Sequence, residues 1–352
     1  MSTTLYSTNA GRINEVKGEI LAHAIPVEVL AMGCTMKQMP TRAGDNITYR
    51  RYLPFGATLG ATPWNNQNRP VVDATAHITQ EGVTPTADQL TPVDVNVKQQ
   101  QYACLYSYTD KAAELYEDDI PEEMKIQTGE RMALVREMVR YGTMKACTNV
   151  LYTGGVSRVA VTGVLDLNEL RLMSRTLKSN HAKKTRRMLS PSANYDTYAI
   201  EAAYTVFAHT DAEADIRDIP GFIPTAKYGT KTAISEEEIG SVEEFRFVLS
   251  PELAAYADAA TGSTAAADGL FSTTGTYSDV YPFIVCGQDA VFDVALRGLN
   301  SFDPYHIPHT KRDKSDPGGQ RGYVGASFWS AVLIVNNGWM GVIEAGVKDL
   351  SA

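Results

Sequence analysis

One stretch of the chain, residues 118 to 150, most constrains the fold. It opens with a helix start signal, because Asp119 and Glu122 have capping-box spacing and Pro121 suits a first helical turn. Gly154 supplies a stop signal downstream. Apolar and small residues recur in between at every third or fourth position: Met124, Thr128, Met132, Val135, Val139, Gly142, Ala146 and Val150. The stretch predicts one amphipathic helix, roughly 45 Å long at about 1.5 Å per residue.

The predicted helix has one continuous apolar face, so we expect it to lie across a sheet and support the segments around it. Met132, Val135 and Val139 are the expected core contacts of this spine helix. Its charged side chains lie mostly off the apolar face: Lys125, Arg136, Glu137 and Arg140. An ordinary long core helix is the alternative interpretation of the same pattern.

Composition excludes several classes of protein. With 352 residues and 44% hydrophobic content, the chain is long enough for two or three compact units and is not wholly disordered. It has no run of eighteen apolar residues and no signal sequence at its start, so we expect neither membrane insertion nor secretion. We expect the protein to work in a cytoplasm. Its four cysteines form no paired motif, which favours small core residues over disulfides or a zinc site.

The charge balance argues against a protein that condenses nucleic acid. The formal net charge is -9 and the pI is about 5.3, whereas tight nonspecific binding needs many cationic contacts with phosphate. We therefore expect weak contact with DNA at most. The segment from Arg175 to Arg187 is a basic exception, open to interpretation as a solvated helix end or as a contact for phosphate or an acidic neighbour.

The first hundred residues lack a core of their own. Residues 1–40 are small, polar and weakly patterned, which favours an arm lying on another surface. Residues 44–92 contain two strand-like runs joined by a stretch rich in Gly, Pro and Asn, and predict a long two-stranded loop. Such a hairpin is marginal in water by itself, so a neighbouring subunit is the expected cover. A change of alternation phase across residues 98–101 predicts a bulge or a bend onto another surface.

The rest of the chain has the alternation of an α+β fold. We expect short and amphipathic helices at 111–116 and 166–180, the second capped by Asp166, then a short strand and a third helix within 188–204. A strand is expected within 237–253, followed by an exposed, mobile insertion at 251–280. At the end, two apolar strands flank Asn336, Asn337 and Gly338, which predicts a tight hairpin.

Signatures of chemistry are weak throughout. There is no G-x-S-x-G elbow, phosphate-binding loop or H-E-x-x-H motif. The glycines of GGQRGYVG precede a strand, which favours a turn and bulge over a phosphate cradle. His306, His309 and Asp313 lack the helical spacing that would bring metal ligands together, so a surface or interface loop is expected. We predict no catalytic, cofactor-binding or metal-binding residues, and no enzyme.

The order of parts, and three segments in particular, resemble a known family. The segments are EEIGSVEEFRFVLSPEL, YPFIVCGQDAV and DPGGQRGYVGASFWSAVLIVNNGWMGVIEA. They are similar to the major capsid proteins of tailed bacteriophages with the Hong Kong 97-type (Johnson) fold, in the coat family typified by the short-tailed coliphage that carries a virion RNA polymerase. These motifs are structural turns and strands, so they indicate fold directly and function only through fold.

The resemblance implies a division of the chain into parts. Residues 1–40 would be the N-terminal arm and 41–97 the extended loop that reaches over a neighbour. Residues 98–163, with the spine helix, and 300–352, with the closing hairpin, would form the peripheral domain. Residues 164–299 would form the axial domain, with the 251–280 insertion near the centre of a capsomer.

The resemblance also implies a function. The chain would assemble with copies of itself into hexamers and pentamers of an icosahedral head that encloses double-stranded DNA, in the host bacterial cytoplasm and then in the virion. Scaffolding, portal and cement or decoration proteins would be further partners. The candidate contacts of the loop are Arg50, Arg51, Leu53, Phe55, Trp64 and Arg69. The alternatives are an extracellular adhesion module, for which export signals and disulfides are missing, and a hydrolase with an unfamiliar site.

Overall fold

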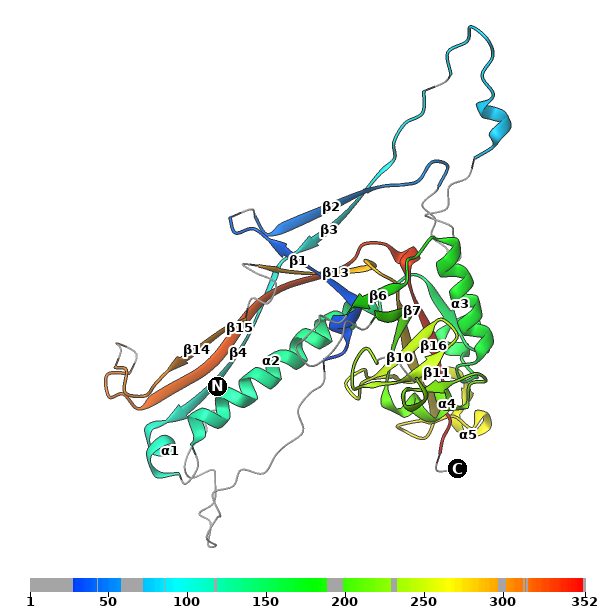
Figure 1. The fold of residues 1–352 in the computed structure, drawn as a ribbon. Coiled ribbons are helices and arrows are strands. Elements are labelled where there is room, and N and C mark those ends of the chain that lie inside the picture. Colours follow the sequence, from blue (N-terminus) through cyan, green and yellow to red (C-terminus); the bar gives the residue numbers. More distant parts are fainter. Residues whose placement is uncertain are drawn as a thin grey trace.

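The computed structural model has an elongated part built on one sheet and a more compact part built on another (Figure 1). A two-stranded loop projects from their junction. The described residues are 28–42, 44–57, 72–85, 87–116, 119–188, 199–228, 233–296, 302–312, 314 and 316–350. Among them, no helix has the length and apolar content needed to cross a bilayer.

The elongated part is a five-stranded sheet. Strands β1, β13, β15 and β14 follow one another in that order, and β4 pairs with β15 in antiparallel register over most of its length. Strand β1 is parallel to β13, whereas β13 and β14 are antiparallel to β15. The strands are β1 (Cys34–Met39), β4 (Gln100–Thr109), β13 (Val291–Leu296), β14 (Phe302–Ile307) and β15 (Arg321–Ile334).

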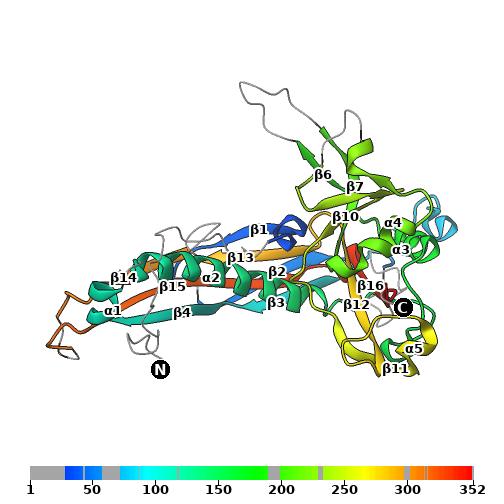
Figure 2. The same ribbon diagram turned by 90° about the horizontal axis from the view of Figure 1, so that it is seen from below.

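Helix α2 (Ile120–Met144) lies along this sheet, as Figures 1 and 2 both show. The expected start is confirmed, because the Asp119 side chain caps the helix by accepting from the Glu122 N–H, with proline in the first turn. The expected end near Val150 is wrong. The helix stops at Met144, and Val150 begins strand β5 (Val150–Tyr152), where parallel pairing with β16 replaces the helical hydrogen bonds.

The spine helix uses only part of its predicted apolar face. Met132 is 2% exposed and packs with Cys104, Ala326 and Phe328 of the sheet. Val135 and Val139 are only partly buried, and each packs against a different cluster. Gly142 and Ala146 were expected on this face but are exposed. Helix α1 (Asp110–Leu115), capped by Thr109, leads into the spine close to its predicted position.

The compact part is a nine-stranded sheet. Its main path is β5-β16-β12-β7-β10-β9-β8, with β11 on β12 and β6 on β7. Helix α3 (Leu167–Ser179), capped by Asp166 as predicted, and helix α4 (Glu213–Asp218) pack into the cluster on one face of the sheet. The strands are β6 (Thr185–Met188), β7 (Ala199–Ala208), β8 (Ile223–Pro224), β9 (Glu238–Val242), β10 (Phe245–Leu249), β11 (Tyr256–Thr264), β12 (Tyr277–Cys286) and β16 (Met340–Ala345).

Three expectations for this part are wrong in whole or in part. Of the segment 188–204, in which a short strand and a third helix were expected, residues 189–198 lie outside the described residues; residues 199–204 belong to strand β7, between β10 and β12, and not to a helix. The single strand expected within 237–253 is the antiparallel pair β9 and β10. The insertion expected at 251–280 contains β11 and helix α5 (Ala265–Asp268), and it buries Leu253 and Ala260. The expected exposure is met in part, since many residues between 251 and 276 are exposed, but the segment is packed at Gly262, where an added Cβ would lie 2.7 Å from the Val159 carbonyl oxygen.

The expected closing hairpin does not form, although both of its strands do. β15 pairs with strands of the five-stranded sheet, and β16 pairs with β12 and β5 of the nine-stranded sheet. Between them, Asn337–Trp339 make a 3-10 turn in which the Asn336 side chain accepts from the Gly338 N–H. The turn therefore passes the chain from one sheet to the other.

The extended loop begins as the expected two-stranded hairpin. Strands β2 (Asn46–Tyr52) and β3 (Pro92–Lys98) are antiparallel, and β3 continues directly into β4 of the five-stranded sheet. The predicted bend falls at Gln99, a buried residue whose Nε2 donates to the Val294 carbonyl at 2.8 Å. Beyond the strands, the described loop contains one short 3-10 turn, Ala74–His77.

Candidate assembly surfaces

The base of the extended loop is anchored on its own subunit. Ile47 and Tyr49 of β2, with Val95 and Val97 of β3, pack on a cluster of the five-stranded sheet, and Tyr49 makes an edge contact with Phe292. The opposite face of the hairpin carries charge. There Arg50 donates two hydrogen bonds, of 2.7 and 2.8 Å, to the exposed Asp94 carboxylate. The hairpin therefore leaves the body at a fixed place and direction.

The predicted contact residues of the loop fall into different environments. Arg50 is paired with Asp94 inside the hairpin, and Arg51 is half-buried. Leu53 is 8% exposed, so its side chain is covered by its own chain. Phe55 is 47% exposed and touches the His77 ring edge-on. Trp64 and Arg69 lie outside the described residues.

Further along, the loop presents apolar side chains to solvent. Their exposed fractions range from 47% to 77%, far above those of core residues. Large apolar side chains that are this exposed make the loop a candidate surface for another molecule to cover. The side chains are Tyr52, Phe55, Val72, Ile78, Val83 and Leu90. Sequence patterning missed most of them because they have no regular period.

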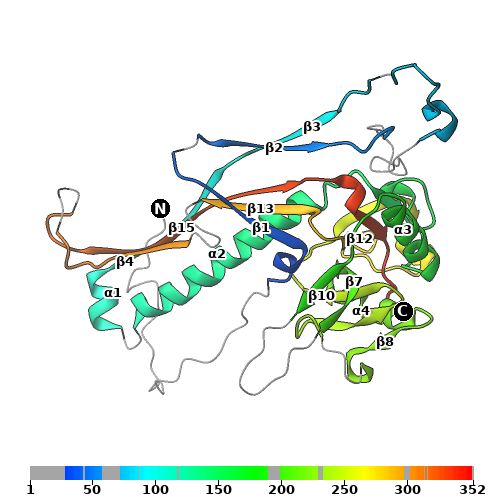
Figure 3. The same ribbon diagram turned by 45° about the horizontal axis from the view of Figure 1, so that its top comes forward.

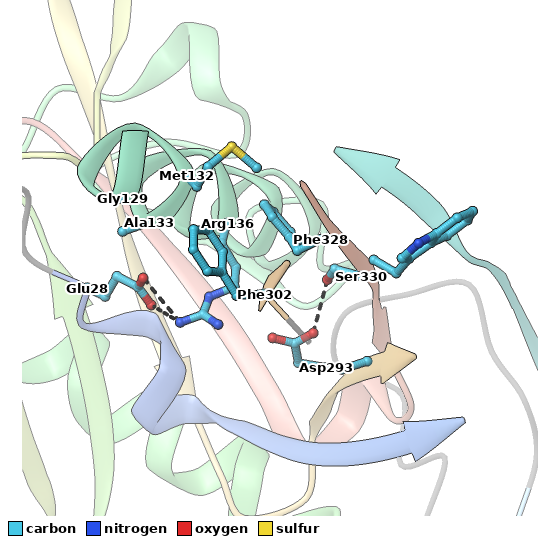
Figure 4. Close-up of a pocket in the computed structure, with 11 residues that line it drawn as sticks. Glu28, Gly129, Met132, Ala133, Arg136, Asp293, Phe302, Phe328 and Ser330 are labelled. Atoms are coloured by element: carbon cyan, nitrogen blue, oxygen red, sulfur yellow. Dashed lines mark hydrogen bonds and ion pairs between the residues drawn. The ribbon is translucent and has the colours of Figure 1, made fainter. Parts of the chain in front are cut away.

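A buried ionic cluster joins the spine helix to the start of the described chain. Arg140 is 0% exposed and donates from Nε and Nη2 to Asp293 of β13, at 2.9 and 2.8 Å. Its Nη1 donates at 2.9 Å to Glu28. Figure 4 shows the same Glu28 carboxylate accepting from Arg136. The expectation that Arg140 and Glu137 lie off the buried face is therefore wrong, because residues from Glu28 onward cover that side of the helix.

Glu137 holds the backbone of this segment. One carboxylate oxygen accepts from the Val29 N–H at 2.9 Å and from the Leu30 N–H at 2.8 Å. Burial raises the pKa of Glu137 above its ordinary value, although these two N–H groups and Arg140 act in the opposite direction. The chain is thus fixed to the spine helix at Val29 and Leu30, near the start of its described residues.

The basic segment on α3 and β6 meets an acidic neighbour, one of the two interpretations left open by the sequence. Lys178 and Lys184 both lie against Glu244, at 2.6 and 3.2 Å, and Ser174 donates to the same carboxylate. Burial alone would raise the pKa of Glu244, but these hydrogen bonds outweigh it and lower the pKa below its ordinary value. Arg171 is likewise paired with Glu243.

The residues considered for metal or phosphate binding have structural roles. The Tyr108 hydroxyl lies 3.1 Å from His306, and His309 lies 3.3 Å from Glu114, whereas Asp313 is outside the described residues. A Cβ on Gly322 would lie 2.1 Å from the Tyr108 ring, so the glycine makes room for a tyrosine. Within the described ranges, no group of three or more His, Cys, Asp or Glu side chains is placed to hold a metal ion.

The cysteines lie in the core, as expected, and are free thiols. Cys104, Cys147 and Cys286 are buried, and Cys34 is partly buried. Burial raises the pKa of both Cys34 and Cys147 to about 12. Such thiols are protonated at neutral pH and are poor nucleophiles or metal ligands.

Comparisons with known proteins point to one kind of fold. The sequence is 21% identical over 342 residues to the major capsid protein of Pseudomonas phage KPP21, covering 87% of this chain and 85% of that protein. No protein-family model matches the chain. The capsid structure of Ralstonia phage GP4 matches 99% of both chains with a TM-score of 0.66 at 11% identity. The capsid structure of Helicobacter pylori bacteriophage KHP30 matches 98% of both chains with a TM-score of 0.62 at 10% identity.

The chain has the fold of phage capsid proteins. The predicted α+β fold of the Hong Kong 97 type is thereby confirmed, since the matches extend over almost the whole chain and include the loop, spine helix and both sheets. In a protein with a capsid fold, the exposed loop and the spine helix are candidate sites of contact between copies. The buried polar clusters make their contacts within one subunit.

Proposed function

We propose that this chain is the major capsid protein of a bacteriophage and forms the hexamers and pentamers of an icosahedral head around double-stranded DNA. The observation that carries the proposal is the sequence match to a phage major capsid protein over most of both chains. The capsid fold of the chain supports the same role. A structural protein of this kind needs no catalytic site.

The geometry supports assembly through the extended loop. The described loop residues include apolar side chains whose exposed fractions are far above those of core residues. The loop also projects beyond both sheets (Figures 1 and 3). Covering such side chains by a neighbouring copy removes apolar surface from water, which favours the assembled state. We infer that residues 41–97 are the loop that reaches a neighbour and that residues 1–40 are the arm.

The finer division of the body is part of the same proposal. Residues 98–163 and 300–352 would form the peripheral domain, and 164–299 the axial domain. The division by residue number does not follow the two sheets at strand β16. This strand belongs to residues 300–352, but it pairs with β5 and β12 in the nine-stranded sheet. The coat family of the short-tailed coliphage with a virion RNA polymerase is the proposed kinship, supported by the three resembling segments. Portal, scaffolding and decoration proteins are proposed partners, and the host cytoplasm is the proposed place of assembly.

Expression of the full chain alone, followed by sedimentation velocity and electron microscopy, tests the coat role. We expect closed shells or capsomer rings in addition to free subunits. A chain that stays monomeric at every concentration, with or without lysate from infected cells, would contradict the proposed role.

A further inference from the structure

A cavity of about 320 Å³ lies in the compact part, where β8, β9 and β10 are neighbouring strands. We call it the β8–β10 cavity. Three cations line it, and they come from separate segments of the chain. Lys184 directly precedes β6, Lys227 ends the 3-10 turn Thr225–Lys227, and Arg246 lies in β10. Lysine and arginine side chains that converge on one hollow are the usual partners of a bound anion.

Two carboxylates also line the cavity, but both are bound to cations. Arg171 donates two hydrogen bonds to Glu243, of 2.9 and 2.6 Å. Lys178 donates to Glu244 at 2.6 Å. The charged residues of the cavity, taken with the partners of their ion pairs, are five cations and three carboxylates: Arg171, Lys178, Lys184, Lys227, Arg246, Glu238, Glu243 and Glu244. In a chain with a formal net charge of -9, this is a local excess of positive charge.

Arg246 is the buried cation of the cavity. Its side chain is 4% exposed, and its guanidinium carbon lies 5.4 Å from the centre of the Tyr228 ring. One guanidinium nitrogen lies 3.5 Å from a Glu238 oxygen, and the Tyr228 hydroxyl donates to the same oxygen at 2.7 Å. The ring and the carboxylate orient the guanidinium, so a ligand that reaches it must enter the cavity. Its planar fork of N–H donors matches the oxygens of a phosphate or a carboxylate.

Lys227 is the exposed cation of the cavity. It makes no ion pair with any described residue, so its ammonium can turn toward a ligand without breaking one. A terminal phosphate carries about 1.5 to 2 negative charges at pH 7, which matches the positive excess better than the single charge of a carboxylate. We propose that the β8–β10 cavity binds the terminal phosphate of a small molecule, either pyrophosphate itself or a phosphorylated organic compound. The inference goes beyond the coat role and does not depend on it.

Duplex nucleic acid is a poorer match for the same cations. Its phosphates lie on the outside of a stiff rod and carry one charge each. A duplex could therefore reach the exposed Lys227, but it would not enter the cavity and reach the buried Arg246. Dependence of binding on Arg246 thus separates a terminal phosphate from a nucleic-acid backbone.

Titration of the full-length chain with pyrophosphate, followed by calorimetry, tests the site. The variants are Lys227→Glu and, as the matched control, Lys111→Glu, because Lys111 is an exposed lysine of α1 that likewise makes no ion pair with a described residue. Both substitutions change the net charge equally. We expect Lys227→Glu to weaken binding at least about tenfold, since it sets a carboxylate against the phosphate, and Lys111→Glu to bind as wild type does. No binding to wild type, or an equal loss in both variants, overturns the proposal.

A second set of titrations tests the role of Arg246 and identifies the kind of ligand. Arg246→Lys keeps the charge but loses the planar fork, so we expect weaker binding of pyrophosphate by a chain whose circular dichroism spectrum is that of wild type. Thymidine monophosphate should bind and thymidine should not, and tighter binding than pyrophosphate would mark an organic phosphate as the preferred source. Binding of thymidine equal to that of its monophosphate overturns the proposal. So does a short hydroxyl-ended DNA duplex that binds more tightly than pyrophosphate and depends on Arg246.

Discussion

Arg140 and Asp293 form a buried ion pair across 153 positions of sequence, with the guanidinium of α2 donating two hydrogen bonds to the carboxylate of β13. Arg140 also reaches Glu28 and lies 3.6 Å from Glu137. This one side chain therefore joins the spine helix, the five-stranded sheet and the first described segment. Its contribution is structural, because all of its charged neighbours are already in place within the subunit.

Arg140→Ala should destabilise the subunit strongly. Removing one partner of a buried pair leaves the other charges uncompensated, so we expect the free energy of unfolding to fall by about 3 to 5 kcal/mol. Lys125→Ala, on the exposed surface of the same helix, should leave it nearly unchanged. Urea unfolding of the free subunit measures both. Equal stabilities of the two variants would show that the cluster does not hold the subunit together.

The sheet-facing side of the spine helix should be needed for folding. Val139→Asp puts an unpaired charge into the helix–sheet contact, which should cost several kcal/mol against a typical total of about 5 to 15 kcal/mol. Val135→Asp should behave alike. Ile126→Asp is the control, since Ile126 is 47% exposed on the same helix. Thermal unfolding and soluble yield are the measurements, and wild-type values for both valine variants would contradict the helix–sheet contact.

Glu244 should make stability depend on pH in the acid range. Its pKa is lower in the folded chain than the ordinary value of 4.5, because Lys178, Ser174 and Lys184 together outweigh the effect of burial. A lowered folded pKa contributes stability above the unfolded value, and this contribution is lost as pH falls below 4.5 through the folded pKa. Wild type should thus exceed Glu244→Gln in stability at pH 7, by about 1 kcal/mol, and converge with it in acid. A difference that is constant with pH would contradict this assignment.

The sequence predicted elements whose signals are local. Asp166 caps α3 and Asp119 caps α2, because a capping side chain binds backbone only a few residues away. Sequence-based prediction was wrong for side chains whose contacts lie far along the chain. Nothing near Glu137 or Arg140 indicates that Glu28 and Asp293 will bury them, since a helical pattern records side-chain polarity and not distant partners.

Long-range pairing also explains the errors in strands. Ala199–Ala208 is rich in alanine and has helix-forming composition, yet it is β7, because β10 and β12 lie on both sides of it. The sequence around Gly338 predicts a hairpin, because the two flanking strands could pair with each other. Instead, β15 pairs within the five-stranded sheet and β16 within the nine-stranded sheet. No local sequence signal indicates this choice of partner.

Deleting residues 57–68 should separate assembly from folding. Residues 58–68 lie outside the described residues, and Phe55 and Val72, on either side of the segment, are about half exposed. We expect a soluble subunit with wild-type thermal stability that no longer forms shells. Electron microscopy and thermal unfolding are the measurements. Shells of normal geometry would show that the loop is not an assembly element.

Particle stability should not rest on the covalent Lys–Asn crosslink known from some relatives with this fold. That reaction needs an uncharged lysine amine on the extended loop, and this sequence has no lysine between Lys37 and Lys98. Loop arginines cannot replace it, because a guanidinium stays protonated at any relevant pH. In the proposed shell, noncovalent burial of loop side chains such as the half-exposed Phe55 would hold the copies together.

Assembled particles boiled in detergent should therefore run on a denaturing gel as single chains near 38.4 kDa. A protein with a known covalent crosslink serves as the positive control for the gel. Reducing agent should make no difference, since all four cysteines are free and at least partly buried. A ladder of covalent oligomers would mean that another nucleophile replaces the missing lysine, because burial between copies leaves no bond that survives boiling.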